Sequence, residues 1–281
     1  MATDRMIVEP APAKLNLALH VRRRCEDGYH DLETLFAFVA DGDVLTVERA
    51  DRDRFAIVGP YAAGLAPDGD NLVTRARDAF THRIAPLPPL AITLDKRLPV
   101  ASGIGGGSAD AAAMLRAAAR IADVPVEDTR LMAIAAALGS DVPACLLGET
   151  AFGSGRGEAL EAVAGLAGRP VLLVNPNVGV PTGPVFARWD GIDRGALPVG
   201  DAWQVALRGR NDLAVPAKLL APVIGEVIDA LDRLTDTSLV RMSGSGATCF
   251  AIFDTASACH AGAEAIRTAY PDWWCLETVL T

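Results

Sequence analysis

The sequence predicts a mixed α+β fold. Runs rich in β-branched residues and segments with helical periodicity are interspersed along the whole chain, without the strict alternation of a doubly wound sheet. Alanine is also used heavily between Ala109 and Ala137, which favours helix in the middle of the chain.

The expected elements follow from these patterns in chain order. Strands are expected at residues 6–8, 17–21, 44–48, 55–58, 90–94, 171–174, 239–242 and 249–253. Helices are expected at residues 71–84, 109–121, 126–138, 217–234 and 256–269. Gly139 follows the third helix as a C′ residue should, and residues 123–125 form a break between two helices.

The chain length allows two domains. With 281 residues it can form two domains of ordinary size, since domains usually run to about 100–200 residues. A glycine-containing turn at residues 165–170 separates the alanine-rich middle from a new strand. We therefore expect an N-terminal domain at residues 1–165 and a C-terminal domain at residues 166–281. Residues 188–200 are expected to form a long connection.

Composition and charge exclude several classes of protein. Hydrophobic residues make up 51% and charged residues 22%, which excludes disorder, and no apolar run reaches the roughly 18 residues of a membrane-spanning helix. The net charge of −9, with basic residues spread out, excludes whole-molecule attraction to nucleic acid or anionic lipid. We expect a soluble protein with no obligate protein partner.

The N-terminus and the cysteines indicate the compartment. The first twelve residues lack the basic start and apolar middle of a secretory signal, which predicts a cytoplasmic protein. The five cysteines are scattered without CxxC spacing and the histidines show no ligand spacing. The sequence therefore predicts reduced thiols, and neither a disulfide framework nor a protein metal site.

A glycine cluster that leads directly into a predicted helix is the strongest local signal. Glycines let backbone N–H groups approach an anion closely, and the first turn of the helix adds unpaired N–H groups and a positive dipole end. We therefore expect a phosphate cradle. Its residues are Pro99, Val100, Ala101, Ser102, Gly103, Ile104, Gly105, Gly106, Gly107 and Ser108.

This cluster matches neither a Walker A loop nor a dinucleotide fingerprint, because the Gly-Lys-Ser/Thr ending and the Gly-x-Gly-x-x-Gly spacing are both missing. The alternative is a plain glycine turn with Ser108 as the helix N-cap. Asp110 would repel a phosphate group. It either points away from the phosphate or faces it through a bound Mg²⁺ ion.

Two further segments carry polar groups or small residues. Lys14 and Asn16 share one face of an otherwise apolar strand, since residues two apart on a strand point the same way. An edge lysine is commonly a solubility device, so both interpretations stay open. The small residues at 243–248 join two strand-like runs. They form either a plain hairpin turn or a loop that leaves room for a substrate or for the first glycine cluster to pack against it.

Asp141 and the pair Tyr29 and His30 complete the candidates. Asp141 follows a helix end and precedes Pro143, which is typical of an N-cap. Tyr29 and His30 follow Asp27-Gly28 and are either turn residues or groups that stack on and hydrogen-bond a base.

Taken together, the three segments resemble the signature motifs of the GHMP kinase superfamily, which is named for galactokinase, homoserine, mevalonate and phosphomevalonate kinases. Within it, the sequence is similar to the kinases that act on 4-diphosphocytidyl-2-C-methyl-D-erythritol. The segments that carry this likeness lie at residues 11–17, 27–30, 139–143, 175–182 and 211–213, spread over almost the whole chain. The sequence at residues 177–183 departs from the family's commonest motif, and residues 189–203 match no motif of the family.

The resemblance implies a two-domain GHMP kinase fold, with an N-terminal domain like ribosomal protein S5 domain 2 and a ferredoxin-like C-terminal domain. It implies transfer of the γ-phosphoryl group of ATP, with Mg²⁺, to the 2-hydroxyl of the methylerythritol unit, a step in non-mevalonate isoprenoid precursor biosynthesis. The substrate would be a small molecule with a cytidine diphosphate group.

The resemblance also implies a role for each candidate. Asp141 would accept the hydroxyl proton, and Lys14 would lie beside it and the hydroxyl. The loop at residues 99–108 would hold the phosphates. Tyr29 and His30 would hold the cytidine end, with Asn16 and Thr182 lining the substrate site. The rivals are a GHMP kinase for a smaller alcohol and a catalytically silent nucleotide-binding regulator, against which the presence of both Lys14 and Asp141 argues.

Overall fold

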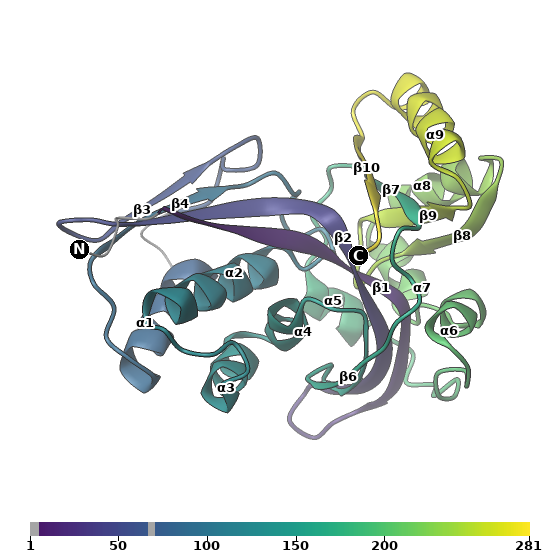
Figure 1. Ribbon diagram of the computed structural model, residues 1–281. Helices are drawn as coiled ribbons and strands as arrows, with labels where there is room; N and C mark the ends of the chain where they lie inside the picture. Colours follow the sequence, from purple (N-terminus) through teal and green to yellow (C-terminus); the bar gives the residue numbers. More distant parts are fainter. Residues whose placement is uncertain (1–5, 67–70) are drawn as a thin grey trace. The chain divides into compact units, whose positions relative to one another are not determined.

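The structure, a computed structural model, describes residues 6–66 and 71–281 (Figure 1). The chain divides into two compact units. Of the described residues, unit 1 contains 6–13, 41–66, 71–100 and 105–148, and unit 2 contains 14–40, 101–104 and 149–281. The expected domain boundary between residues 165 and 166 stays a prediction. It divides the chain into two continuous segments, whereas each packing unit consists of several separate segments.

Two long strands contribute to both units. Strand β1 (Ile7–Arg24) and strand β2 (His30–Arg49) pair with each other. The sequence predicted only the short runs 6–8, 17–21 and 44–48 within them. Their buried stretch is apolar with few turn residues, so nothing in the local chemistry ends either strand early.

Unit 1 combines strands with a group of helices. Strand β4 (Leu90–Asp95) pairs antiparallel with the second half of β2, and strand β3 (Arg54–Val58) pairs parallel with β4. The side chains of β4 alternate between buried and half-buried, so one face of the strand faces the core. Figure 1 shows the helices of this unit gathered on one side of these strands.

The helices of unit 1 pack against one another. They are α1 (Leu72–Arg83), α2 (Gly106–Ile121), α3 (Thr129–Leu138) and α4 (Val142–Leu147). Asn71 caps α1 and Asp128 caps α3 through side-chain hydrogen bonds to backbone N–H groups. Alanines fill most of the buried face of α2, and their small side chains let neighbouring helices approach closely.

Unit 2 contains a four-stranded antiparallel sheet with helices packed on it. The strands are β7 (Pro170–Asn175), β8 (Thr237–Met242), β9 (Cys249–Phe253) and β10 (Trp274–Val279), in the order β10-β7-β9-β8. Helices α8 (Val223–Asp232) and α9 (Ala256–Ala269) pack on this sheet. This succession of strands and helices is the βαββαβ pattern of a ferredoxin-like domain, which confirms that part of the predicted fold.

The remaining elements of unit 2 are short. Strand β5 (Ala151–Gly155) pairs with the first half of β2 and with β6 (Ala159–Ala162). Helices α5 (Thr182–Ala187), α6 (Ala202–Arg208) and α7 (Ala214–Leu220) precede α8. None of these was expected apart from α7, and β10 was also missed, because most of these segments are too short to show a clear period. Of α4, only the N-cap at Asp141 was expected.

One expectation about helices is wrong, and one alternative is excluded. The single helix expected at residues 217–234 is broken, since α7 ends at Leu220 and α8 starts at Val223 with Pro222 as its N-cap. A proline lacks the N–H that a continuous helix needs at that point. Ser108 is not the N-cap of α2, because Gly105 holds that position and the helix starts at Gly106.

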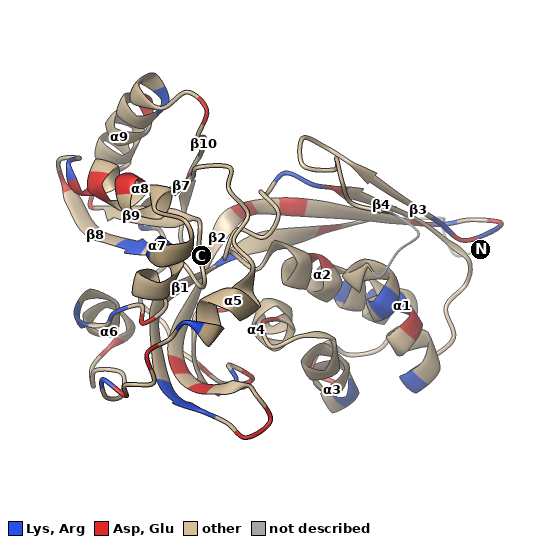
Figure 2. Ribbon diagram, turned by 180° about the vertical axis from the view of Figure 1, so that it is seen from behind, with Lys and Arg blue, Asp and Glu red and all other residues tan. Residues whose placement is uncertain are grey.

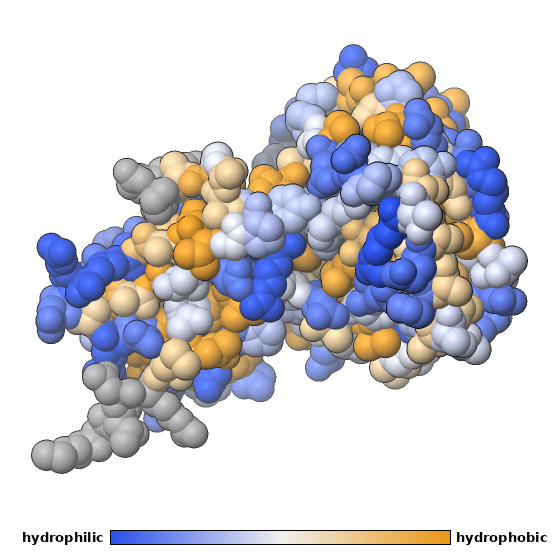
Figure 3. Space-filling view, turned by 90° about the horizontal axis from the view of Figure 1, so that it is seen from above, coloured by the Kyte–Doolittle hydropathy of each residue, from blue (hydrophilic) through white to orange (hydrophobic). Residues whose placement is uncertain are grey.

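The surface is charged and mixed. Acidic and basic residues are interspersed along the ribbon (Figure 2), and the face in Figure 3 mixes hydrophilic and hydrophobic side chains. No helix within residues 6–66 and 71–281 has the length and apolar character needed to cross a membrane. All five cysteines are free thiols, and Cys145, Cys249 and Cys259 are buried.

Candidate functional site

The glycine cluster forms a bent loop followed by a helix start, as predicted. Gly103 has φ +77° and Gly105 has φ +67°, which is the left-handed region that favours glycine. Gly105 is the N-cap of α2 and contributes no side chain, so the first N–H groups of this helix lack a side-chain acceptor from the cap. Such a helix start is an anion-binding device.

The loop is divided between the two units. Residues 101–104 belong to unit 2, whereas residues 99–100 and 105–108 belong to unit 1. Within unit 1, Gly106 lies close to buried polar groups, because a Cβ on it would be 3.1 Å from the Nζ of Lys96. Asp110 lies on the same first stretch of α2 and is buried.

Asp110 has a buried cation as its partner. Its Oδ2 accepts a hydrogen bond from the Nζ of Lys96 at 2.7 Å. Burial raises the pKa of Asp110 to about 7, although the Lys96 ammonium acts in the opposite direction. Lys96 is thus the internal partner of the Asp110 carboxylate, and the two alternatives for its orientation toward a phosphate group stay predictions.

The second small-residue loop packs against the first one. A Cβ on Gly103 would lie 2.5 Å from the carbonyl oxygen of Ser243, so only glycine fits at that contact. The Oγ of Ser243 donates to the carbonyl of Gly103 at 3.0 Å, and the backbone N–H of Thr248 donates to the carbonyl of Ser102 at 3.0 Å. The loop at residues 243–248 connects β8 and β9, so it is a turn between two strands and also packs against the first glycine cluster.

Lys14 and Asn16 form an ordered polar pair on β1. Lys14 is only 2% exposed, which excludes the solubility interpretation of an edge lysine. Its Nζ donates to the Oδ1 of Asn16 at 2.8 Å, and the Nδ2 of Asn16 donates to the Oγ1 of Thr34 at 2.8 Å. The hydroxyl of Thr34 in turn donates to the carbonyl of Ala18 at 2.6 Å. This chain fixes the orientation of the Asn16 amide and leaves its oxygen to hold the ammonium.

Two further contacts in unit 2 join this region. The backbone N–H of Lys14 donates to the carbonyl of Ile104 at 2.9 Å. The hydroxyl of Thr182, the first residue of α5, lies 3.0 Å from the Oγ of Ser245 in the second loop. Within unit 2 the structure therefore gathers Lys14, Asn16, part of the glycine loop and Thr182 around one loop at residues 243–248.

Tyr29 and His30 lie at the tip of the β1–β2 hairpin. Tyr29 is in the turn and exposed, with the guanidinium of Arg156 stacked 3.9 Å from its ring centre. His30 begins β2 and packs against the rings of Phe186 at 4.9 Å and Trp189 at 5.7 Å. Burial and the nearby charge of Arg24 lower the pKa of His30, so the imidazole is neutral at pH 7.

This aromatic group was only partly found from the sequence. Phe186 and Trp189 fall in or next to the segment at residues 188–200, which showed no recognisable pattern. The only signal in the sequence that could have marked them is their aromatic character.

Asp141 lies at the start of α4 in unit 1. It holds the expected N-cap position, but its side chain makes no capping hydrogen bond. Its backbone carbonyl accepts from the N–H of Cys145 at 3.1 Å, which closes the first turn of the helix. The carboxylate is half-buried. Lys14 belongs to unit 2, so each of the two residues is positioned by its own unit.

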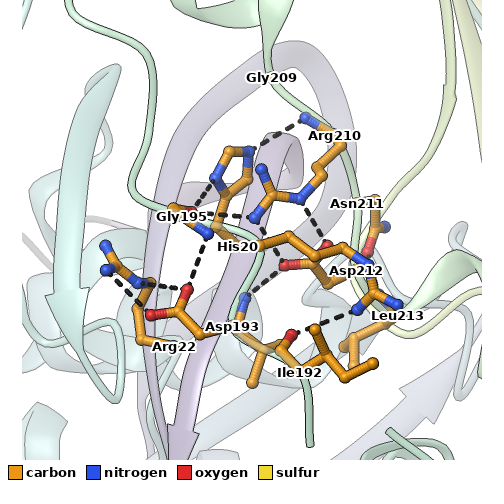
Figure 4. Close-up of polar contacts among 12 residues, drawn as sticks. His20, Arg22, Ile192, Asp193, Gly195, Gly209, Arg210, Asn211, Asp212 and Leu213 are labelled. Carbon is orange, nitrogen blue, oxygen red and sulfur yellow. Dashed lines mark hydrogen bonds and ion pairs between the residues drawn. The ribbon is translucent and has the colours of Figure 1, made fainter. Parts of the chain in front are cut away.

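A clamp of polar contacts holds the long connection against β1 within unit 2 (Figure 4). The Nδ1 of His20 donates to the carbonyl of Gly195 at 3.1 Å, and its Nε2 accepts from the backbone N–H of Arg210 at 3.2 Å. Arg22 forms an ion pair with Asp193, at 3.0 Å from its Nε. Asp212 accepts from the N–H of Val21 at 2.9 Å. The 188–200 segment is thus an ordered part of the unit.

Asn211 connects this clamp to the second loop. Its Nδ2 donates to the carbonyl of Met242 at 2.8 Å and to that of Gly244 at 2.9 Å. Its Oδ1 accepts from the N–H of Leu213 at 2.9 Å. The Asn211-Asp212-Leu213 segment therefore fixes the backbone of the loop on which the candidate residues of unit 2 depend.

The described residues offer phosphate ligands but no metal cage. Among residues 6–66 and 71–281, no group of three or more His, Cys, Asp and Glu side chains is placed to hold a metal ion. Mg²⁺ in kinases is bound mainly by substrate phosphates and waters with one or two carboxylates, so a protein cage is not required.

Family models match both parts of the chain. The model for the GHMP kinases N terminal domain matches residues 71–149, which include the glycine loop and Asp141. The model for the GHMP kinases C terminal domain matches residues 203–272, which include the loop at residues 243–248.

Similar proteins and structures carry consistent names. A protein of Rhizorhabdus wittichii named 4-diphosphocytidyl-2-C-methyl-D-erythritol kinase is 53% identical over 97% of this chain and 94% of its own length. One of the same name from Sphingopyxis alaskensis is 50% identical over 95% of this chain and 96% of its own.

A solved 4-(cytidine 5'-diphospho)-2C-methyl-D-erythritol kinase aligns with a TM-score of 0.77 and 35% identity, over 97% of this chain and 99% of its own. The homoserine kinase of Cytophaga hutchinsonii aligns with a TM-score of 0.73 at 17% identity, over 100% of this chain and 96% of its own, and shows the shared fold.

Proposed function

The chain belongs to the GHMP kinase family, and we propose that it transfers the γ-phosphoryl group of ATP to the 2-hydroxyl of 4-diphosphocytidyl-2-C-methyl-D-erythritol. The observation that carries this proposal is the 53% identity to a kinase of that name over 97% of the chain. The reaction would contribute to non-mevalonate isoprenoid precursor biosynthesis in the cytoplasm.

The glycine loop holds the phosphates of ATP. Residues 99–108 supply backbone N–H groups, and the helix α2 that follows has sixteen residues and presents the positive end of its dipole. The left-handed backbone at Gly103 and Gly105 supports this role, because it turns successive N–H groups toward one side. Phosphoryl transfer depends on such positioning and charge neutralisation more than on covalent chemistry.

Lys14 and Asp141 act on the reacting groups. The ammonium of Lys14 neutralises charge that develops on the transferring phosphoryl group, and the Asn16 amide oxygen keeps it in one orientation. Asp141 accepts the proton of the 2-hydroxyl. One observation supports the role of Lys14, which is buried with Asn16 as its polar partner.

The substrate is bound through its cytidine and its alcohol. Tyr29 and His30 bind the cytidine end, where a neutral imidazole next to Phe186 suits a base that both stacks and forms hydrogen bonds. Asn16 and Thr182 line the alcohol end, since both are tied to the loop at residues 243–248. Discrimination between alcohols would come from the cytidine diphosphate group.

Mg²⁺ accompanies ATP. When bound, it neutralises negative charge on the β- and γ-phosphates during transfer. The chain's own contribution is the N–H groups of the glycine loop and the Lys14 ammonium.

An assay with phosphorus NMR tests the proposal. Purified protein is incubated with ATP, Mg²⁺ and the diphosphocytidyl substrate, and in parallel with homoserine or mevalonate as the alcohol. We expect ADP formation and a new phosphomonoester on the 2-oxygen only with the cytidine compound. Equal turnover of an alcohol without cytidine would favour a different GHMP kinase activity, and absence of ATP consumption with every alcohol would indicate a silent nucleotide-binding protein.

A further inference from the structure

Three charged side chains form a closed group in unit 1. The Nζ of Lys96 lies 2.5 Å from the Oδ2 of Asp43 and 2.7 Å from the Oδ2 of Asp110. All three side chains are at most 5% exposed. Asp43 comes from β2, Lys96 follows β4, and Asp110 lies in α2, so the group joins three elements. We call these residues the buried triad.

The buried triad lies directly against the helix start. Gly106 is the first residue of α2, and a Cβ on it would be 3.1 Å from the Nζ of Lys96 and 3.5 Å from the Oδ2 of Asp43. The N–H of Ala109 donates to the carbonyl of Gly105 at 2.8 Å, which closes the first turn. Asp110 is the next residue, so the triad is anchored one turn into the helix.

Asp43 also fixes the chain that enters the glycine loop. Its Oδ1 accepts from the backbone N–H of Arg97 at 2.6 Å and from that of Leu98 at 2.8 Å. Leu98 immediately precedes Pro99, the first residue of the loop. Asp43 therefore fixes the backbone that enters the loop. Lys96, which binds Asp43, also binds Asp110 in the helix that follows the loop.

The net charge of the triad affects how strongly the helix start attracts an anion. Two buried carboxylates behind a helix start would oppose a phosphate group in front of it. Burial lowers the pKa of Lys96, but the carboxylates of Asp110 and Asp43 outweigh it and hold that pKa above its ordinary value. Lys96 thus stays charged and offsets one of the two carboxylates. The Oδ1 of Asp110 has no hydrogen-bond partner among the described residues, so Lys96 is the main group that stabilises this carboxylate.

We propose that Asp43, Lys96 and Asp110 are positioning residues for the phosphate loop: they lock its entry and exit, and Lys96 keeps the helix start receptive to the ATP phosphates. This inference rests on the proposed use of ATP and names residues outside the signature segments. None of the three touches the nucleotide in this account. They act through the backbone at residues 97–98 and 106.

The test compares ATP binding with turnover. Lys96→Met keeps the approximate length of the side chain but leaves the buried carboxyl groups of Asp43 and Asp110 without a cation. We expect it to raise the KM for ATP, and the Kd of the β,γ-imido analogue of ATP, by about tenfold or more. We expect the KM of the alcohol substrate and the Kd of adenosine to stay within about threefold of the wild-type values, because neither ligand carries the triphosphate.

Charge rescue separates this role from a purely structural one. Adding Asp110→Asn to Lys96→Met restores the net charge of the triad without restoring its hydrogen bonds, so we expect part of the lost ATP affinity to return. If the double variant binds the analogue no better than Lys96→Met, the charge role is excluded. Glu9→Gln is the matched control, because Glu9 pairs with Arg116 and Arg120 further along the same helix. It should leave the KM for ATP unchanged.

The single variant Asp110→Asn keeps the test decisive if Lys96→Met does not fold. The asparagine has the same size and can still accept from Lys96, and it removes the negative charge that Asp110 carries above its pKa of about 7. We expect it to bind the ATP analogue at least as tightly as the wild type, and weaker binding by tenfold would overturn the proposal. Wild-type protein that binds the analogue but does not phosphorylate the cytidine substrate would contradict the proposed function alone. An active wild type together with unchanged ATP affinity in Lys96→Met would contradict this inference alone.

Discussion

The backbone N–H of Asn16 donates to the Oγ of Ser243, 3.1 Å away, across 227 positions of the sequence. The same hydroxyl donates to the carbonyl of Gly103. Ser243 therefore fixes the strand that carries Lys14 relative to residues 101–104 of the glycine loop. In unit 2, a candidate catalytic residue and a candidate phosphate-binding segment share one buried support.

Lys14→Ala tests the role of the Lys14 ammonium. The substitution removes the ammonium while the hydrogen bond from Asn16 to Thr34 remains possible. We expect kcat to fall by about 10² or more and the KM for ATP to change by less than about tenfold, since the charge acts on the transition state. The measurement is steady-state kinetics with both substrates. A rise in the KM for ATP at unchanged kcat would assign Lys14 to ground-state nucleotide binding.

Asp141→Asn tests the proton acceptor. The change keeps the size of the side chain and removes its charge, so we expect turnover to fall by about 10² to 10⁴, the usual contribution of general-base catalysis. Asp128→Asn is a suitable control, because Asp128 caps α3 and asparagine caps a helix equally well. Turnover of Asp141→Asn within a few fold of the Asp128→Asn value would remove the assignment.

Gly103→Ala tests the contact between the two loops. Both Gly103 (φ +77°) and Gly168 (φ +81°) have left-handed backbone, but only at Gly103 would a Cβ meet the Ser243 carbonyl, at 2.5 Å. We expect Gly168→Ala to lower the free energy of unfolding by about 1–2 kcal/mol, the cost of the left-handed conformation. Gly103→Ala should lower it by about 1–3 kcal/mol more, because the loops must separate.

Urea unfolding and the KM for ATP measure the two glycine variants. The KM should rise in Gly103→Ala and stay unchanged in Gly168→Ala. Equal losses of stability with an unchanged KM in both variants would show that the packing of the two loops is not needed for ATP binding.

His20 predicts a pH dependence of stability. Burial lowers the pKa of His20 below its ordinary value of about 6.5, although the Gly195 carbonyl acts in the opposite direction. The unfolded chain then binds a proton that the folded chain does not, so stability is full above pH 6.5 and is lost as the pH falls below it. We expect the difference in unfolding free energy between pH 7.5 and pH 5 to shrink in His20→Gln. His82→Gln, at an exposed position of α1, should keep the wild-type difference.

The glycine loop and the helix start after it were predictable because their chemistry is local. Consecutive glycines before an alanine-rich helix determine both the backbone conformation and the helix that follows, and the structure starts α2 at Gly106. The mixed fold class followed from periodicity in the same way. The break between α7 and α8 was missed, because the apolar period continues across Pro222 and hides the interruption.

The supports of the loop were not predictable because they are distant in sequence. Asp43 and Lys96 are separated by 53 positions, and neither lies in a motif. Asp110 was noticed only as a misplaced charge near a phosphate site. Its partner becomes visible only when β2, the chain after β4 and α2 are brought together. The clamp around His20 is similar, since Gly195 and Arg210 come from a stretch without local pattern.

A crystal structure of the protein with the β,γ-imido analogue of ATP, Mg²⁺ and the cytidine substrate tests the central claim most directly. We expect the triphosphate to accept hydrogen bonds from backbone N–H groups of residues 103–108, with the 2-hydroxyl of the substrate in line with its terminal phosphate. A triphosphate bound elsewhere, with these N–H groups turned to solvent, would contradict the account.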